Sequence, residues 1–279
     1  MTEHSTPDRY GVMGHPISHS KSPIIHTRFA EQTGQSITYL PIHVLPGDFA
    51  RAIAAFQVEG GKGVSVTLPF KEDAGNLVDT LTPRAQRADA VNTIWFDESG
   101  RKHGDNTDGI GLIRDLKENR KIPVTKRRVL LLGAGGAARG VVGPLLDEGP
   151  WELVIANRTP EKAEKLAKRF ARHGPVRGCG LIDLGSTSFD LIINATSASL
   201  TGEVPAIADT VLCPRGWCYD LMYDASQSTP FVRWGERHGA SQSVDGLGML
   251  VEQAAEAFYL WRGVRPHTSP VIAALRNSL

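Results

Sequence analysis

Polar side chains that could bind and transform a small oxygenated molecule stand at several predicted strand ends and loops. Ser18 and Ser20 are separated by one residue in an extended loop, so their hydroxyls point to the same side. Such hydroxyls can hold a carboxylate or a diol, and each hydrogen bond to a charged group contributes about 1.5–3 kcal/mol. Thr67 adds a hydroxyl at a strand end, Lys71 an amine at the next helix start, and Asp108 a carboxylate before another helix. We expect these side chains to converge at the carboxyl edge of a parallel sheet, where α/β proteins bind ligands.

A glycine-rich turn follows the apolar run in residues 129–139, which read Val-Leu-Leu-Leu-Gly-Ala-Gly-Gly-Ala-Ala-Arg. Gly133, Gly135 and Ala138 fit the pattern G-x-G-x-x-[G/A], which turns a strand tightly into a helix. The first glycine permits the turn, the second lets the backbone approach a pyrophosphate, and the alanine allows close packing. The helix start offers N–H groups to an anion. The alternative is a tight turn without a ligand, but the strand before it and the helix pattern after it favour a dinucleotide site.

The end of the following strand, Ile155-Ala156-Asn157-Arg158-Thr159, distinguishes between the two nicotinamide cofactors. NAD usually needs an Asp or Glu there for the ribose hydroxyl, whereas NADP needs a cation for the 2′-phosphate. Arg158 occupies this position, and a guanidinium can both pair with phosphate and stack on adenine. Thr159 adds a hydroxyl, and Lys162 lies one turn into the next helix. The pattern favours NADP over the alternative of a surface arginine at a helix start.

Hydrophobic periodicity predicts the elements that position these residues. Strands are expected over residues 10–13, 37–44, 63–67, 90–96, 102–105, 129–132, 152–156, 190–193 and 217–221. Helices are expected over about 22–33, 49–59, 109–118 and 248–262, after Gly133, Pro160 and Pro230, and from Pro270 to the end. Ser22 is expected to cap the first helix, with Pro23 at its first position. The alternation predicts two α/β units with mainly parallel sheets, the dinucleotide fold spanning about 109–244.

The composition bounds the class of protein. With 279 residues the chain can bury a sizeable core, and 41% hydrophobic and 22% charged residues are typical of a soluble globular protein. Lys plus Arg number 31 against 30 acidic residues, so no net charge recruits nucleic acid or a membrane surface. The three cysteines form no C-x-x-C pair, and the first nine residues hold no apolar signal core. We expect a cytoplasmic protein with reduced thiols and no nucleic-acid or membrane partner.

With these residues in view, the chain resembles the shikimate dehydrogenase family over nearly all of its length. Eight stretches carry the resemblance in the order of the family: Gly14 to Pro23, Val66 to Lys71, Ala90 to Thr93, Asp105 to Gly109, Gly133 to Ala137, Asn157 to Thr159, Asn194 to Ser197, and Asp245 to Ala254. Each stretch alone is a modest signal, but all eight together are very specific.

The resemblance implies reversible, NADP-linked reduction of 3-dehydroshikimate to shikimate, in the pathway to chorismate and the aromatic amino acids. It implies two α/β domains with a cleft between them. One is a discontinuous, mainly parallel substrate-binding and catalytic domain over 1–108 plus 245–279. The other is a Rossmann-like NADP domain over 109–244.

The resemblance also implies roles for individual residues. Lys71 and Asp108 would be the catalytic pair. The residues that would hold the substrate are Ser18, Ser20, Thr67, Asn92, Tyr223 and Gln253. Those that would bind the cofactor are Gly133, Ala134, Gly135, Gly136, Ala137, Asn157, Arg158, Thr159, Lys162, Thr196, Leu221 and Gly246. Pro83 departs from the pattern, since relatives often carry an acidic residue near the cofactor there, and it is left out of the expected site.

Several alternatives stay open at this point. The sequence does not decide whether Lys71 transfers a proton to the ketone oxygen or only stabilises its growing charge. Without the resemblance, Tyr223 could be an ordinary core aromatic and Gln253 a solvent-facing helix residue. No metal is expected. His15, His19 and His26 lie close together in the sequence, but they form no H-E-x-x-H motif and Pro16 interrupts any helix.

Two other functions compete with the implied one. The first is a relative that also oxidises quinate, often with NAD, against which Arg158 and the paired serines argue. The second is a catalytically silent dinucleotide-binding regulator on the same fold, which would not need both Lys71 and Asp108. The sequence is compatible with a monomer or a homodimer.

Overall fold

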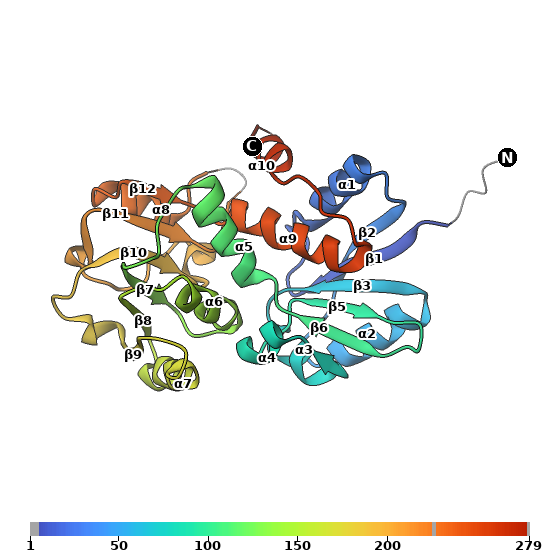
Figure 1. Cartoon of the computed structure of the whole chain (residues 1–279), viewed down its shortest axis with the longest axis horizontal. Helices are drawn as coiled ribbons and strands as arrows, with labels where there is room; N and C mark the ends of the chain where they lie inside the picture. Colours follow the sequence, from blue (N-terminus) through green and yellow to red (C-terminus); the bar gives the residue numbers. More distant parts are fainter. Residues whose placement is uncertain (1–5, 225–226, 278–279) are drawn as a thin grey trace. The chain divides into compact units, whose positions relative to one another are not determined.

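The computed structural model describes residues 6–224 and 227–277, which form two compact units (Figure 1). The first unit comprises the chain up to Thr107 together with Val251–Leu275, and the second comprises Asp108–Leu250 with the chain from Arg276 onward. The chain first passes from one unit to the other between Thr107 and Asp108, one residue before the predicted boundary at 108/109. The second crossing falls within α9 (Leu247–Arg262), shortly after the predicted boundary at 244/245.

The first unit contains a six-stranded sheet in the order β2-β1-β3-β5-β6-β4. Its strands are β1 (Asp8–Gly14), β2 (Ile37–His43), β3 (Gly61–Val66), β4 (Thr80–Leu81), β5 (Thr93–Phe96) and β6 (Lys102–Asp105). β1 pairs in parallel with β2 and β3, and β4 with β6, whereas β5 runs antiparallel to both of its neighbours. Five of the six described strands therefore run in the same direction, as the predicted mainly parallel sheet requires. β5 alone is reversed, because the short turn between β5 and β6 leaves no room for a crossover.

Helices cover both faces of this sheet (Figure 1). They are α1 (Ser22–Thr33), α2 (Phe49–Val58), α3 (Lys71–Leu77), α4 (Pro83–Ala88), the part of α9 from Val251 onward, and most of α10 (Ser269–Asn277). Tyr10 of β1 stacks on Trp261 of α9, while Met13 of the same strand lies in the core formed with α2 and α3. Successive side chains of a strand face opposite ways, so α9 and α2 lie on opposite faces.

The second unit contains a fully parallel six-stranded sheet in the order β12-β11-β10-β7-β8-β9. Its strands are β7 (Arg128–Leu132), β8 (Glu152–Asn157), β9 (Val176–Gly180), β10 (Phe189–Asn194), β11 (Leu212–Asp220) and β12 (Gln242–Val244). The sequence did not predict β9 and β12. Both are edge strands with few apolar residues, so neither produces a strong hydrophobic pattern.

The sheet of the second unit is also buried on both faces. Val129 and Leu131 of β7 lie in one hydrophobic cluster, and Leu130 and Leu132 lie in another. The covering elements are α5 (Asp108–Arg114), α6 (Gly136–Asp147), α7 (Pro160–Phe170), α8 (Pro230–Arg237), a π-helix (Asp115–Asn119) and the 3₁₀ helices Leu181–Leu184, Ala198–Thr201 and Asp209–Val211. The predicted α/β class is confirmed. Among the described helices, none is both long and apolar enough to span a bilayer.

The helix predicted over 109–118 changes its winding at Asp115. Its first part is α5, and a π-helix continues from Asp115 to Asn119. The Asp115 carboxylate is fully buried and accepts hydrogen bonds from the Tyr219 hydroxyl at 2.6 Å and the Asn119 amide at 2.9 Å. Hydrophobic periodicity does not encode these polar contacts, so the sequence predicted a uniform helix.

One buried histidine lies in the aromatic core of the first unit. His26 of α1 has 0% exposure, and its ring stacks on Tyr39 with centroids 4.2 Å apart. Within the described residues, neither of its ring nitrogens has a hydrogen-bond partner. Burial lowers the pKa of His26 to about 3. His26 is therefore a neutral core residue, and no metal-binding cluster is found among the described residues.

We expect His26→Phe to change the pH dependence of stability. Between the ordinary pKa of 6.5 and the lowered value of about 3, the unfolded chain binds a proton that the folded chain excludes. The free energy of unfolding therefore falls as the pH drops below 6.5, by about 1.4 kcal/mol per pH unit. The parent loses this free energy on acidification and the variant does not. The free energy of unfolding of the variant minus that of the parent should therefore be roughly 2 kcal/mol higher at pH 5 than at pH 8. Urea unfolding at both pH values measures this, and an equal difference at the two would contradict it.

Candidate functional site

The glycine turn of the second unit lies at the carboxyl end of β7. Gly133 has a φ of +106°, and a Cβ there would lie 3.1 Å from the carbonyl atoms of Ala195. Both the backbone conformation and the close approach require glycine. Gly135 differs, since a Cβ there would meet nothing within 4 Å, and the residue is exposed at the start of α6. The open space in front of this helix start leaves room for an anionic ligand, so the turn fits a pyrophosphate.

Basic and polar residues follow the next strand of this sheet. Arg158, Thr159 and Lys162 are all exposed where β8 leads into α7. The Asn157 amide donates to the Thr159 carbonyl at 3.0 Å and fixes the turn. Thr159 occupies the N-cap position, but its hydroxyl makes no capping bond. A guanidinium, an ammonium and a hydroxyl at a helix start form a donor set that suits a phosphate.

The ends of β10, β11 and β12 complete the same sheet edge. The Leu221 N–H donates to the Asn194 carbonyl at 2.8 Å, and the Thr196 hydroxyl donates to the Asn194 side chain at 2.7 Å. A Cβ on Gly246 would lie 2.4 Å from the Leu221 carbonyl oxygen, so only glycine fits. The expected cofactor residues Gly133, Thr196, Leu221 and Gly246 thus lie at one edge of the second sheet.

The buried carboxylate of Asp220 links the segments that form this edge. Its carboxylate has 0% exposure and accepts from the Asn194 amide at 3.0 Å, and from the Ser199 and Thr229 hydroxyls at 2.6 Å each. Burial raises the pKa of this carboxyl, while the hydroxyls that donate to it act in the opposite direction. The segments before and after β11 are therefore fixed to a single buried group. The sequence predicted no role for Asp220.

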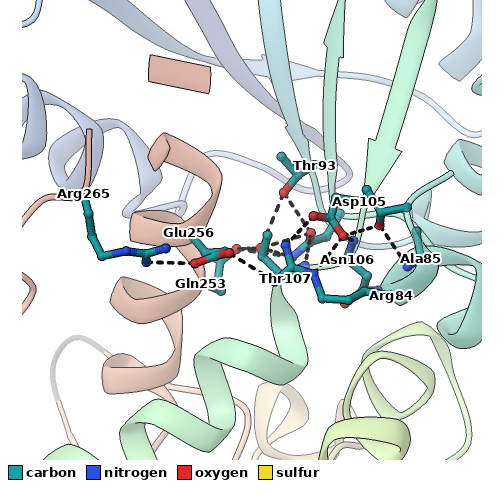
Figure 2. A network of polar contacts seen from close by, with 11 residues as sticks. Arg84, Ala85, Thr93, Asp105, Asn106, Thr107, Gln253, Glu256 and Arg265 are labelled. Atoms are coloured by element: carbon teal, nitrogen blue, oxygen red, sulfur yellow. Dashed lines mark hydrogen bonds and ion pairs between the residues drawn. The ribbon is translucent and has the colours of Figure 1, made fainter. Parts of the chain in front are cut away.

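In the first unit, Asn92 lies in one polar network with Thr107 and Gln253. Figure 2 labels Thr107 and Gln253 of this network. The Asn92 amide nitrogen donates to the Gln253 side-chain oxygen at 3.3 Å and to the Thr107 hydroxyl at 3.0 Å. The Asn92 side-chain oxygen accepts from the Thr107 N–H at 2.9 Å. The network fixes the side-chain orientation of Asn92. Gln253, which could have faced solvent, is half-buried.

The remaining expected residues of the first unit gather at neighbouring strand ends. The Thr67 N–H donates to the Met13 carbonyl at 3.0 Å, which joins the ends of β1 and β3. Lys71 is the first residue of α3, and its carbonyl accepts from the Val91 N–H at 2.8 Å, next to Asn92. These contacts connect the segment that begins α3 with the segment that leads into β5.

The two serines lie in the loop after β1, and the expected cap at Ser22 is wrong. Helix α1 begins at Ser22, Lys21 occupies the N-cap position, and no side chain caps the helix. Instead, the Ser20 hydroxyl oxygen accepts from the Ser22 N–H at 3.3 Å. Ser18 is exposed and Ser20 half-buried. An oxygen occupied in this way leaves the Ser20 O–H available as a donor.

Of the expected catalytic and substrate-holding residues, Asp108 and Tyr223 belong to the second unit. Asp108 has 4% exposure and is the first residue of α5, and Tyr223 is half-buried in the loop after β11. The sequence analysis assigned no role to Thr107, which the structure bonds to Asn92 and Gln253. Its position within the stretch Asp105 to Gly109, directly before Asp108, was the signal that could have identified it.

Comparison with known proteins identifies the family. Three family models match: the shikimate dehydrogenase substrate binding domain over residues 12–94, shikimate / quinate 5-dehydrogenase over 115–202, and the shikimate 5'-dehydrogenase C-terminal domain over 246–276. A shikimate dehydrogenase (NADP(+)) of Nitrosococcus oceani is 55% identical over 98% of this chain and 96% of its own. The chain belongs to the shikimate dehydrogenase family.

Solved structures agree with this membership in the shikimate dehydrogenase family. An Ael1 enzyme from Pseudomonas putida is 47% identical, with a TM-score of 0.87 over 96% of this chain and 98% of that one. Shikimate 5-dehydrogenase from Thermus thermophilus, solved with NADP(H) and shikimate, is 34% identical, with a TM-score of 0.86 over 98% and 100%. The family resemblance drawn from the sequence is confirmed.

Proposed function

We propose that this chain catalyses the reversible, NADPH-dependent reduction of 3-dehydroshikimate to shikimate, a step toward chorismate and the aromatic amino acids. The observation that carries the proposal is the hydrogen bond between Asn92 and Gln253, 161 positions apart in the sequence. Both residues are expected from the family pattern to hold the substrate. Relatives at 55% identity that are named as NADP(+) enzymes support the choice of cofactor.

The cofactor-binding residues fit NADP by their chemistry. The exposed start of α6 at Gly135 and Gly136 would hold the pyrophosphate through backbone N–H groups. Arg158 would form paired hydrogen bonds with the 2′-phosphate, which a carboxylate at this position would repel. When bound, NADPH supplies the hydride.

The remaining work falls to the substrate-holding and catalytic residues. Hydroxyls of Ser18, Ser20 and Thr67 would donate to the substrate carboxylate, and Asn92 and Gln253 would orient its ring hydroxyls. As the ketone is reduced its oxygen gains negative charge, and the Lys71 ammonium stabilises that oxygen and delivers a proton to it. Lys71 and Asp108 would act as the catalytic pair, and Tyr223 would be a further substrate-holding residue.

A broader quinate/shikimate dehydrogenase is the second candidate. One matching family model covers shikimate and quinate enzymes together, so its match does not separate the two substrates. Quinate carries an additional ring hydroxyl, and a site formed for shikimate would leave that group without a partner. A silent regulator is disfavoured because Lys71 and Asp108 are both present.

An assay with each substrate and each cofactor tests the proposal. The purified protein is incubated with shikimate or quinate and with NADP or NAD, and the absorbance of the reduced nicotinamide is followed. We expect the highest kcat/KM for shikimate with NADP. Comparable values for quinate would establish the broader enzyme, and no turnover with any pair would leave only the regulator.

The proposal includes a cytoplasmic location and a monomeric or homodimeric state. Cys179, Cys213 and Cys218 are all free thiols, which suits a reducing compartment. Size-exclusion chromatography with light scattering would distinguish monomer from dimer.

A further inference from the structure

A half-buried arginine connects two segments of the first unit, one that leads from an expected substrate-holding residue and one that carries another. Arg84 lies in the first turn of α4, directly after Pro83. Its Nε and one terminal nitrogen donate to the two oxygens of Asp105, at 3.2 and 2.5 Å. Its other terminal nitrogen donates to Glu256 of α9 at 3.1 Å. We call Asp105, Arg84 and Glu256 the Arg84 bridge (Figure 2).

One end of the bridge fixes the chain that leads to Thr107. Asp105 has 0% exposure, and besides Arg84 it accepts from the Thr82 hydroxyl at 2.5 Å and the Asn106 N–H at 2.7 Å. Thr107, two residues further on, exchanges hydrogen bonds with Asn92. The position of Asp105 therefore determines where Thr107 meets Asn92.

The other end of the bridge fixes the face of α9 that carries Gln253. Glu256 and Gln253 are three residues apart on one helix, so their side chains share a face. Glu256 has 5% exposure, and its second oxygen accepts from Arg265 at 2.8 Å. Arg84 is 35% exposed at its side chain, whereas both of its carboxylate partners are buried. Figure 2 shows Gln253 and Glu256 on the same side of the helix, toward Thr107 and Arg84.

Only a guanidinium can make this connection. Its planar fork pairs with both oxygens of Asp105 and leaves a separate N–H group for Glu256. A lysine ammonium is a point charge that cannot reproduce the paired geometry and also reach a second carboxylate. Without Arg84, the buried Asp105 would lose its guanidinium partner, and Glu256 would lose one of its arginine partners while keeping Arg265.

We infer that Arg84 and Glu256 are positioning residues for shikimate binding, acting by holding Gln253 and Thr107 against Asn92. This inference rests on the proposed function, because it takes Asn92 and Gln253 as the groups that bind the substrate. Neither Arg84 nor Glu256 is assigned a contact with shikimate.

Glu256→Gln and Arg84→Lys test the inference, with Arg262→Lys as the matched control. Arg262 lies on the same helix and pairs with Asp8 at 2.5 Å, about 13 Å along the axis from Gln253. For both bridge variants we expect the KM and the calorimetric dissociation constant for shikimate to rise about tenfold, the worth of one misplaced hydrogen bond. The kcat and the dissociation constant for NADP should stay within about threefold. The control substitution Arg262→Lys should lower the melting temperature and leave the dissociation constant for shikimate unchanged.

A double-variant cycle shows whether Glu256 acts through Gln253. If it does, adding Glu256→Gln to Gln253→Ala should not raise the KM for shikimate further, because the group being positioned is gone. Additive effects would overturn the inference. So would bridge variants that lose thermal stability as the control does but bind shikimate normally. Either outcome would overturn the role of Arg84 and Glu256 alone. The proposed function would still hold if the parent protein turns over shikimate normally.

Discussion

Replacing Lys71 with alanine is expected to lower kcat for shikimate oxidation by about 10²–10⁴, the usual range for loss of a general acid or base. Lys71 begins α3, and its carbonyl accepts a hydrogen bond from the Val91 N–H, next to the expected substrate-holding residue Asn92. The dissociation constant for NADP should change little, because the expected cofactor residues lie in the second unit. Steady-state kinetics and a fluorescence titration with NADPH measure the two quantities. Near-normal turnover would exclude the catalytic role.

Lys71→Arg separates the two roles that the sequence left open. Arginine keeps the positive charge but does not give up its proton near neutral pH. If Lys71 carries the proton, the arginine variant should be as slow as the alanine variant. If Lys71 only stabilises charge, arginine should restore a large part of kcat. Exposed Lys62 of β3 provides a control, since Lys62→Ala should leave kcat unchanged.

Replacing Arg158 with alanine is expected to raise the dissociation constant for NADP by roughly 10–100-fold. The lost contact is a hydrogen bond between charged groups, worth about 1.5–3 kcal/mol. NAD lacks the 2′-phosphate, so its dissociation constant should change by no more than about threefold, and the preference for NADP should largely disappear. Titration of the parent and the variant with both cofactors measures this.

Lys168→Ala is the matched control for Arg158. Lys168 is exposed in the last turn of α7, at the far end of the helix that begins after Arg158. Its removal changes the net charge of the protein by the same amount, and the NADP constant should not change. If Arg158→Ala left the dissociation constant for NADP unchanged, or weakened the binding of NAD equally, the guanidinium would not bind the 2′-phosphate.

The sequence predicted the parts of the fold that follow from local patterns. The apolar run of β7 and the glycines after it identified the turn into α6, because a buried strand and a positive φ each leave a strong local signal. β9 and β12 were missed because edge strands carry few apolar residues, whereas the reversed direction of β5 follows from the short turn that leads into β6. The predicted class and family are confirmed.

The supporting groups of the candidate site could not be predicted in the same way. Lys71, Asp108 and Arg158 stand in motifs that indicate their chemistry. Arg84 and Glu256 are 172 positions apart and meet only in the folded chain. A buried ion pair of this kind has no periodicity and no fixed spacing. The roles assigned to individual site residues stay predictions until the variants are measured.

The central claim is that this chain moves a hydride between shikimate and NADP, and an isotope measurement tests it most directly. The protein is incubated with NADP and shikimate carrying deuterium on the carbon that becomes the ketone. We expect the NADPH formed to contain one deuterium per molecule and 3-dehydroshikimate to appear in equal amount. NADPH without deuterium, or no NADPH at all, would contradict it.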